Sequence, residues 1–324
     1  MPKRMEENNQ IQQKIFNKVE RKNLYIGIFM AVILGIIVLV FLFSSARKDD
    51  KTAALAPKTD FFQGLSLEAR AVFVWDIKEK KAVFEKDSDK VMPLASLAKL
   101  MTAVTAIEQL PKHAVITVNK NSLDAEGDVG ILVGEKFNIG DLINLSLLTS
   151  SNDAVAAVSV AAGGVASGTN DKEIGHDEFI KLMNQKATDL GVTSMVFYNE
   201  SGLDLNDKMG GAYGSARDVA RLFEYTLENY PELVLPTKNE NITIKSASSI
   251  LHQASNTNPQ IGKIPGILAS KTGFTDIAGG NLAVVLDPSI GRPFIIVVLG
   301  SSYEGRFDDV VTLSQATLSY LKNN

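Results

Sequence analysis

The sequence predicts an α/β domain in which one β-sheet takes strands from both ends of the folded region, with helices between them. Three patterns predict it: a strand pair within residues 71–86, helical apolar periods within residues 93–162, and two strands followed by an amphipathic helix within residues 281–321. The chain has 324 residues, of which 45% are hydrophobic and 22% charged. This is enough to bury a substantial core, so we expect one large domain or two closely packed lobes.

The N-terminal part carries an uncharged apolar run over residues 24–43. Its length matches the roughly 20 residues that a helix needs to cross the hydrocarbon of a bilayer. More basic residues precede the run than follow it, and the positive-inside rule then places the N-terminus in the cytoplasm. The basic residues are Lys3, Arg4, Lys14, Lys18, Arg21 and Lys22 before the run, and Arg47, Lys48 and Lys51 after it.

We therefore expect a single-pass protein of the cytoplasmic membrane, with residues 1–23 as a cytoplasmic tail and residues 24–43 as the transmembrane helix. Residues 44–60 are small, charged and poor in large apolar side chains, which predicts a flexible tether. Residues 61–324 form the exported domain. The alternative is a signal peptide cleaved near Ser44-Ser45-Ala46, but the apolar run exceeds the usual length of about 7–15 residues.

The first elements of the exported domain are predicted to be two strands, 71–76 and 81–86, that form an antiparallel hairpin around a polar turn at residues 77–80. After Pro93 a helix is predicted, because apolar residues recur at a helical period. These residues are Leu97, Leu100, Met101, Val104 and Ile107. Ser96 is therefore expected at the start of a buried helix.

A second helix is predicted from Asp141, as its N-cap, through Leu148, and a third over residues 154–162, which are apolar on nearly every face. The polar residues 150–152 separate these two helices. Residues 266–270 are a candidate strand. Farther on, residues 281–286 and 293–299 predict two buried strands joined by a turn, and residues 308–321 predict a closing amphipathic helix.

Charge and cysteine content exclude several classes of function. The formal net charge is -4 and no dense basic stripe occurs in the exported part, which argues against a nucleic-acid partner. Cysteine is absent, so thiol catalysis, disulfides and thiolate metal sites are excluded. The histidines, His113, His176 and His252, lack a ligand-like spacing, so each is predicted to be a surface or loop histidine, and no metal or cofactor is expected.

Two charged pairs near the predicted helices are read as solvated or ion-paired groups. They are Arg217-Asp218, within the segment Ser215-Ala216-Arg217-Asp218, and Arg306 with Asp308.

Ser96 and Lys99 lie three residues apart, which on a helix places the hydroxyl and the amine on one face. A serine hydroxyl needs a base before it can attack an amide, and a desolvated lysine with a lowered pKa can be that base. The helix N-terminus would also favour negative charge on a reacting carbonyl oxygen. Alone, this spacing is more typical of a capping serine followed by an exposed lysine, which is its meaning in most proteins.

Two further motifs carry hydroxyl, amide and amine groups. Ser150-x-Asn152 lies in the turn between two predicted helices, where simple helix capping is the competing interpretation. Lys271-Thr272-Gly273 follows the candidate strand 266–270 and could hold a carboxylate, while glycine would let a substrate backbone come close. An ordinary strand end is the alternative for this tripeptide.

The three motifs in this order resemble the signature set of penicillin-binding proteins and serine β-lactamases. The text around them narrows the resemblance to the low-molecular-mass D-alanyl-D-alanine carboxypeptidases over about residues 68–322. The matching segments are PLASLAKLMTAVTAIE, GEKFNIGDLINLSLLTSSNDAV, LGVTSMVFYNESGLDL, YGSARDVARL and SKTGFTDIAGGNLAVVL. The resemblance implies a serine transpeptidase/β-lactamase-like fold, in which helices flank an antiparallel sheet and a mainly helical lobe completes a cleft.

The resemblance also implies roles for individual residues. Ser96 would be the acylated nucleophile and Lys99 its base, and Ser150 and Asn152 would relay protons and hold the substrate backbone. Lys271 and Thr272 would bind the terminal carboxylate, Gly273 would be a further substrate-binding residue, and the backbone N–H groups of Ser96 and Phe274 would form the oxyanion hole. The substrates would be peptidoglycan stem peptides ending in D-Ala-D-Ala, and β-lactams would acylate the same serine as inhibitors.

The sequence departs from the family pattern at Ala98, Ser151 and Phe274, where threonine, glycine and histidine are frequent. None of these changes removes a reacting group. Three alternatives stay open: a D,D-endopeptidase that cuts cross-links, a class A-like β-lactamase, and a catalytically idle cell-wall scaffold. Against the β-lactamase, the segment around Glu200 lacks that class's Glu-x-x-Leu-Asn pattern.

Overall fold

The computed structural model describes residues 30, 32–36, 61–123, 130–169 and 171–323. The chain divides into two units, Met1–Thr59 and Asp60–Asn324, and each is described by itself. In the first unit residues 32–36 are helical, and most of the predicted transmembrane span 24–43 lies outside the described residues. Within the described ranges, no helix combines the length and the hydropathy that a membrane crossing needs.

The second unit is built on a five-stranded antiparallel sheet, as the sequence predicts. Its strand order is β10-β11-β12-β1-β2, so strands from the two ends of the domain meet where β1 pairs with β12. The strands are β1 (Ala71–Asp76), β2 (Lys81–Lys86), β10 (Ile267–Thr275), β11 (Gly279–Leu286) and β12 (Phe294–Ser301). The predicted hairpin 71–86 is confirmed, and β10 and β2 are the two outer strands.

Alternating side chains of the central strands enter two separate cores, because successive residues of a strand point to opposite faces. One core contains Phe73, Ala283, Val285, Ile295 and Val297. The other contains Val72, Val74, Val284, Ile296 and Val298. Both faces of the sheet are therefore buried, which explains the unbroken apolar runs 282–286 in β11 and 294–299 in β12.

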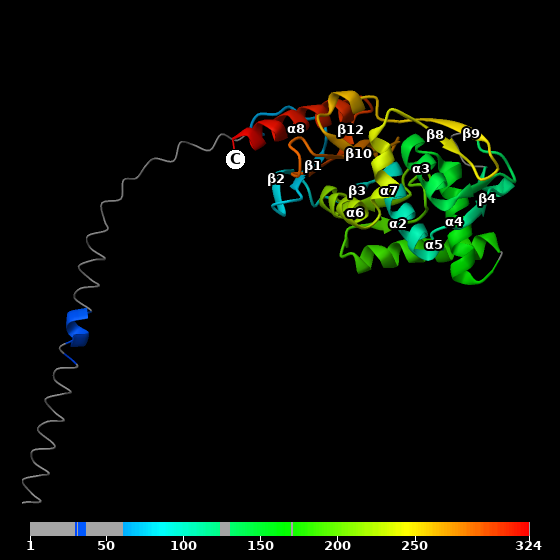
Figure 1. Ribbon diagram of the computed structural model, residues 1–324, viewed down its shortest axis with the longest axis horizontal. Coiled ribbons are helices and arrows are strands. Elements are labelled where there is room, and N and C mark those ends of the chain that lie inside the picture. The colour runs from blue at the N-terminus through cyan, green and yellow to red at the C-terminus, as the bar shows by residue number, and fades with distance from the viewer. Residues whose placement is uncertain (1–29, 31, 37–60, 124–129, 170, 324) are drawn as a thin grey trace, which may run out of the picture. The chain divides into compact units, whose positions relative to one another are not determined.

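Helices cover both faces of the sheet (Figure 1). The closing helix α8 (Gly305–Lys322) packs on β11 and β12 and places Phe307, Val310 and Leu313 in the second core. On the opposite face α6 (Ala216–Asn229) contacts β1 and β12. The first core continues from there into a helical lobe of α2 (Lys99–Gln109), α3 (Ile139–Thr149), α4 (Asn152–Ser167), α5 (Lys172–Asp189) and α7 (Pro231–Val234).

Short strands complete the described fold. They are β3 (Met92–Pro93), β4 (Val115–Thr117), β5 (Lys136–Asn138), β6 (Val196–Phe197), β7 (Ala212–Gly214), β8 (Asn241–Lys245) and β9 (Leu251–Ser255). β3, β7 and β6 form one small antiparallel sheet, and β4 with β5 and β8 with β9 form two-stranded sheets. β3 of this small sheet directly precedes the segment that carries Ser96.

The boundaries of two predicted helices are corrected. The helix expected to begin at Asp141 begins at Ile139, with Asn138 as its N-cap, and the side chain of Asn138 bonds Asp141 at 2.9 Å. The helix expected over residues 154–162 is α4, which begins at Asn152 and ends at Ser167. Asp141 thus lies in the first turn of α3, where its negative charge interacts favourably with the positive end of the helix dipole.

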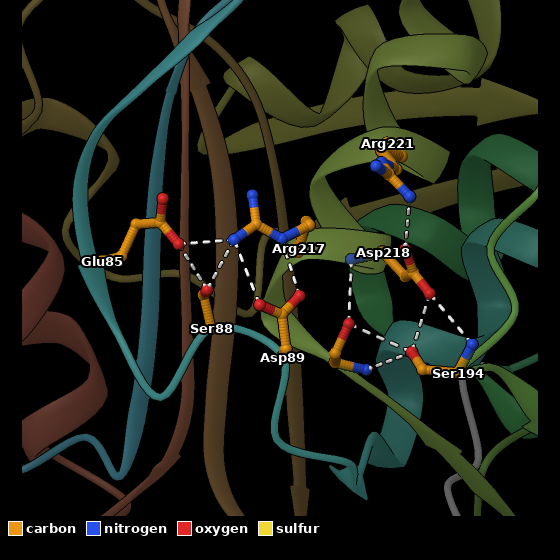
Figure 2. Close-up of polar contacts among 8 residues, drawn as sticks. Glu85, Ser88, Asp89, Ser194, Arg217, Asp218 and Arg221 are labelled. Atoms are coloured by element: carbon orange, nitrogen blue, oxygen red, sulfur yellow. Dashed lines mark hydrogen bonds and ion pairs between the residues drawn. The ribbon is translucent and has the colours of Figure 1, made fainter.

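Arg217, in the first turn of α6, is ion-paired, as the sequence predicts (Figure 2). Its guanidinium reaches the end of β2 and the following turn, where Nε bonds Asp89 at 2.7 Å and Nη2 bonds Glu85. Asp218 is more buried than expected, at 5% exposed, and its carboxylate accepts from the backbone N–H of Ser194 at 3.0 Å. These contacts tie α6 to β2 and to the segment before β6.

Candidate active site

Ser96 and Lys99 lie on adjacent turns at the start of the helix that crosses the first core. Ser96 is in the 3₁₀ turn Ala95–Ala98, and Lys99 begins α2. The backbone turns sharply before the serine, because Ala95 has a φ of 48°, a conformation that L residues rarely adopt. Lys99 Nζ donates to Ser96 Oγ at 2.8 Å. Ser96 is half-buried and can be reached, whereas Lys99 is fully buried.

The amine of Lys99 is surrounded by neutral oxygen atoms. Besides Ser96, it donates to Asn152 Oδ1 at 2.7 Å and to the backbone carbonyl of Ser201 at 2.9 Å. Burial lowers the pKa of Lys99 to about 7, and the charge of Glu200 opposes part of that shift. A substantial fraction of this lysine is therefore neutral near pH 7 and able to take a proton from Ser96.

The turn between α3 and α4 separates two hydroxyl groups with different tasks. Ser151 caps α4, because its side chain accepts from the backbone N–H of Ala154 at 3.1 Å. Ser150 has a φ of 60° and does not cap this helix; its hydroxyl instead accepts from Lys271 Nζ at 2.9 Å. Capping, the competing interpretation of this motif, thus applies to Ser151, while Ser150 and Asn152 both reach the lysines.

The motif Lys271-Thr272-Gly273 lies inside the outer strand β10, not at its end. Lys271 is 1% exposed, and burial together with the nearby charges of Lys99 and Arg306 holds its pKa well below the ordinary value. A Cβ added to Gly273 would lie 2.9 Å from the carbonyl oxygen of Leu94, so glycine is needed where β10 meets the turn that carries the serine.

Phe274 follows on the same strand and is 42% exposed as a residue, and its ring packs edge-on against Tyr303 at 5.0 Å between centroids. The prediction for Arg306 was wrong in part. Arg306 is not a solvated or ion-paired surface group, because it is 3% exposed and its Nη1 donates to the backbone carbonyl of Gly273 at 2.7 Å. Its guanidinium also lies over the rings of Tyr303 and Phe307, at 4.4 and 4.6 Å from their centroids.

Thr257 joins the site from a loop that sequence reasoning did not single out. Its hydroxyl lies 2.6 Å from the hydroxyl of Thr272, and its backbone N–H donates to the carbonyl of Leu148 at 3.2 Å. The loop is fixed further by Asn256, whose amide donates to the carbonyl oxygens of Thr237 and Asn239. No local pattern in the sequence marks this threonine, since its position depends on the folding of β8, β9 and β10 together.

One of the three histidines differs from the prediction. His113 is exposed in a loop, as expected. His176 lies on α5 with its side chain 33% exposed, and its Nε2 is 2.9 Å from Glu200. The prediction for His252 was wrong, because this residue lies on β9, is 6% exposed and bonds Glu135 at 2.7 Å. A partner distant in sequence buries that ring, and ligand spacing carries no information about such a partner.

The described residues therefore bring all three motifs into one place. A half-buried hydroxyl at Ser96 faces a desolvated amine at Lys99, and a second amine at Lys271 lies between the hydroxyl of Ser150 and the outer strand. Such an arrangement can activate a serine for attack on a carbonyl carbon and can attract an anionic group of a substrate.

The sequence and the fold both match one group of known proteins. A family model described as D-alanyl-D-alanine carboxypeptidase, peptidase family S11, matches residues 55–302. The chain is 29% identical over 261 residues to a D-alanyl-D-alanine endopeptidase of Pseudomonas aeruginosa, which covers 76% of each protein. It is 27% identical over 279 residues to the D-alanyl-D-alanine carboxypeptidase DacF of Bacillus subtilis, covering 84% of this chain and 65% of DacF.

Solved structures agree with this result. Penicillin-binding protein D2 of Listeria monocytogenes, in its ampicillin-bound form, is 29% identical with a TM-score of 0.64, and the match covers 78% of this chain and 98% of that one. The DD-transpeptidase of Streptomyces K15 has the same fold, with a TM-score of 0.70 at 21% identity over 79% of this chain and 98% of that one. Because the family model covers most of the chain, the protein belongs to the D-alanyl-D-alanine carboxypeptidase family of serine peptidases.

Proposed function

We propose that this protein removes the terminal D-alanine from peptidoglycan stem peptides through an acyl-enzyme on Ser96. The observation that carries the proposal is the 2.8 Å contact between Ser96 Oγ and the buried amine of Lys99. The pKa of that amine is lowered to about 7, because burial disfavours its charged form. The amine can therefore accept a proton at neutral pH, as a general base must.

In the acylation step, Ser96 Oγ attacks the carbonyl carbon of the penultimate D-alanine while its proton passes to Lys99 Nζ. The backbone N–H groups of Ser96 and Phe274 would stabilise the oxyanion, which fits the close approach of Gly273 to Ser96 N, 3.2 Å from an added Cβ. The bond from carbon to nitrogen then breaks, and the leaving amine takes a proton. The Ser150 hydroxyl is the proposed donor, and it regains the proton that Lys99 took up by way of Lys271, whose Nζ lies 2.9 Å from Ser150 Oγ. Lys99 is then neutral again before deacylation, and Lys271 keeps its own proton.

In the deacylation step, water attacks the ester, neutral Lys99 accepts the proton of the water, and Lys99 passes that proton to Ser96 Oγ, 2.8 Å away, as it leaves. Asn152 would hold the substrate amide beside Lys99, to which it is bonded at 2.7 Å. The terminal carboxylate of the substrate would meet Lys271 and the paired hydroxyls of Thr272 and Thr257. A carboxylate there would also stabilise Lys271 in its charged form. β-Lactams would acylate Ser96 in the same way and remain attached longer.

We also propose that residues 24–43 anchor the protein in the cytoplasmic membrane with the N-terminus inside, so that the peptidase unit faces the peptidoglycan. The basic residues before the span and its uncharged length support this orientation. A C-terminal fusion to alkaline phosphatase, which is active only outside the cytoplasm, should be active in cells. An inactive fusion made at full length would contradict the proposed orientation.

A second candidate function is D,D-endopeptidase activity on cross-linked stem peptides. It is favoured by three relatives, one each from P. aeruginosa, Escherichia coli and Haemophilus influenzae, that are named D-alanyl-D-alanine endopeptidases. Both reactions break the same kind of bond and use the same serine, so the motifs do not separate them.

The test compares two substrates: a diacetyl-L-lysyl-D-alanyl-D-alanine peptide and a cross-linked muropeptide dimer. Purified protein should release D-alanine from the first, and Ser96→Ala should release none. Efficient cleavage of the dimer with little release of D-alanine would instead establish the endopeptidase. If neither substrate is cut, the proposal fails, and rapid turnover of a penicillin in that case would identify a β-lactamase.

A further inference from the structure

A second ionisable pair lies near Lys99, close enough for the charge of Glu200 to affect the pKa of Lys99. His176 of α5 and Glu200, in the segment between β6 and β7, are joined by a contact of 2.9 Å between Nε2 and Oε2. The side chain of Glu200 is 13% exposed and that of His176 is 33% exposed. Burying a carboxylate is costly unless a partner compensates its charge, and His176 is that partner for Glu200. The burial of an ionisable pair beside Lys99 therefore needs a physical explanation.

The segment that carries Glu200 also binds two side chains from the start of α2. The carbonyl of Glu200 accepts from Thr102 Oγ1 at 2.6 Å, and the carbonyl of the next residue, Ser201, accepts from Lys99 Nζ at 2.9 Å. Gly202 has a φ of +79° and lies so close to the turn before Ser96 that an added Cβ would be 1.9 Å from the carbonyl oxygen of Ala95. A change at Glu200 is thus transmitted to Lys99 through a rigid backbone.

Charge connects the two pairs as well. Burial alone would raise the pKa of Glu200, but the bond from His176 and the charges of His176 and Lys99 lower it, so the carboxylate is ionised at neutral pH. That negative charge raises the pKa of Lys99 against the larger effect of burial. The pKa of His176 is raised by its bond to Glu200, so a proton on His176 cancels part of the charge that Lys99 faces.

We propose that Glu200 is a positioning residue for Lys99 and that His176, by pairing with Glu200, sets how much negative charge Lys99 faces. The inference rests on the proposed role of Lys99 as the base. Neither residue needs to touch the substrate. The pair would act by holding the backbone that accepts from Lys99 and by adjusting the pH at which Lys99 becomes a base.

Other charged groups near the pair are few in the described part of the chain. Asp177 lies beside His176, with 3.8 Å between its Oδ1 and Nδ1 of the ring. Of the elements packed against α5, α4 carries Asp153 in its first turn, and α2 carries Glu108, which pairs with Lys186 of α5. Lys271 also lies near Lys99, and the charge of Lys99 lowers the pKa of Lys271.

The experiment measures the second-order rate constant for acylation by a fluorescent penicillin between about pH 5 and 9 in wild type, Glu200→Gln and His176→Gln. Glu200→Gln removes the negative charge, so the acid limb of the profile should move to lower pH. His176→Gln leaves Glu200 uncompensated, so the limb should move to higher pH. A displacement of about half a pH unit would change the rate below the limb about threefold.

A matched control is Glu178→Gln, on the same helix, whose carboxylate pairs with Lys181 at 3.2 Å on the surface. This variant should keep the acid limb of the wild-type profile.

Should a substitution prevent folding, NMR of the wild type alone tests the coupling. The chemical shift of the Lys99 ε-carbon, followed against pH, should show a second inflection at the pKa at which His176 itself titrates. A missing inflection would contradict the coupling.

Folded variants that lose rate without a displaced limb, or whose limbs move in the same direction, would overturn the inference and assign the pair a structural role only. These outcomes are distinct from failure of the proposed function. A wild type that neither binds penicillin nor releases D-alanine would contradict the role of Lys99 itself and the inference with it, whereas unmoved limbs in active variants contradict only the inference.

Discussion

The state of Lys99 predicts how acylation depends on pH. With its pKa lowered to about 7 by burial, about 9% of the amine is neutral at pH 6 and about 91% at pH 8. The rate constant for penicillin acylation should therefore rise about tenfold over these two pH units and level off above pH 8. A lysine with the ordinary pKa of 10.5 would instead give a rise of about 100-fold over the same interval, with no plateau.

The assay is labelling by a fluorescent penicillin, in which the reaction is quenched at short times and the labelled protein is quantified at about pH 5.5 to 9. This range extends at least about 1.5 pH units to either side of the expected midpoint. Lys99→Arg is the control, because arginine keeps the positive charge but does not become a base, and it should lower the rate constant by about 10² or more. A profile that is flat, or that still rises steeply above pH 8, would refute the assignment of Lys99 as a desolvated base.

Three further predictions concern the surroundings of the site. Gly202→Ala should lower the free energy of unfolding by more than about 1 kcal/mol and slow acylation, because its Cβ would lie 1.9 Å from the Ala95 carbonyl oxygen. Denaturation measures the first effect and penicillin labelling the second. A variant as stable as wild type would contradict this close approach. Thr257→Val removes the hydroxyl 2.6 Å from Thr272, so the KM for D-Ala-D-Ala peptides should rise several-fold with kcat little changed, and an unchanged KM would exclude Thr257 from the carboxylate pocket. His176→Gln should lower Tm most near about pH 5.5. The pKa of His176 is raised in the folded protein, so the protonated ring stabilises the fold below its ordinary pKa of 6.5, and this contribution is lost as pH rises through the raised pKa. A Tm deficit that grows above about pH 8 would contradict this sign.

Local patterns were enough to predict the frame of the molecule. The hairpin over 71–86 and the strands near 281–286 and 293–299 were predicted from apolar and β-branched runs, and the structure confirms them as β1, β2, β11 and β12. The motifs were also predictable, because the spacing of Ser96 and Lys99 on a helix determines that their side chains meet.

Contacts between residues distant in the sequence were not predictable in this way. The burial of Arg306 depends on the carbonyl of Gly273, and that of His252 depends on Glu135, each more than 30 residues away. The N-cap of α3 at Asn138 was missed because both Asn138 and Asp141 are good capping residues and only the preceding strand decides between them. The pairing of Glu200 with His176 was not predicted, since the histidine lies on α5, 24 residues earlier in the sequence.

The most direct test of the account is to find where a penicillin binds covalently. Intact protein is treated with benzylpenicillin, digested, and mapped by mass spectrometry beside Ser96→Ala. We predict one penicilloyl group per chain, on Ser96, and none on the variant. A group on Ser150 or any other residue, or equal labelling of the variant, would contradict the central claim that Ser96, activated by Lys99, is the nucleophile.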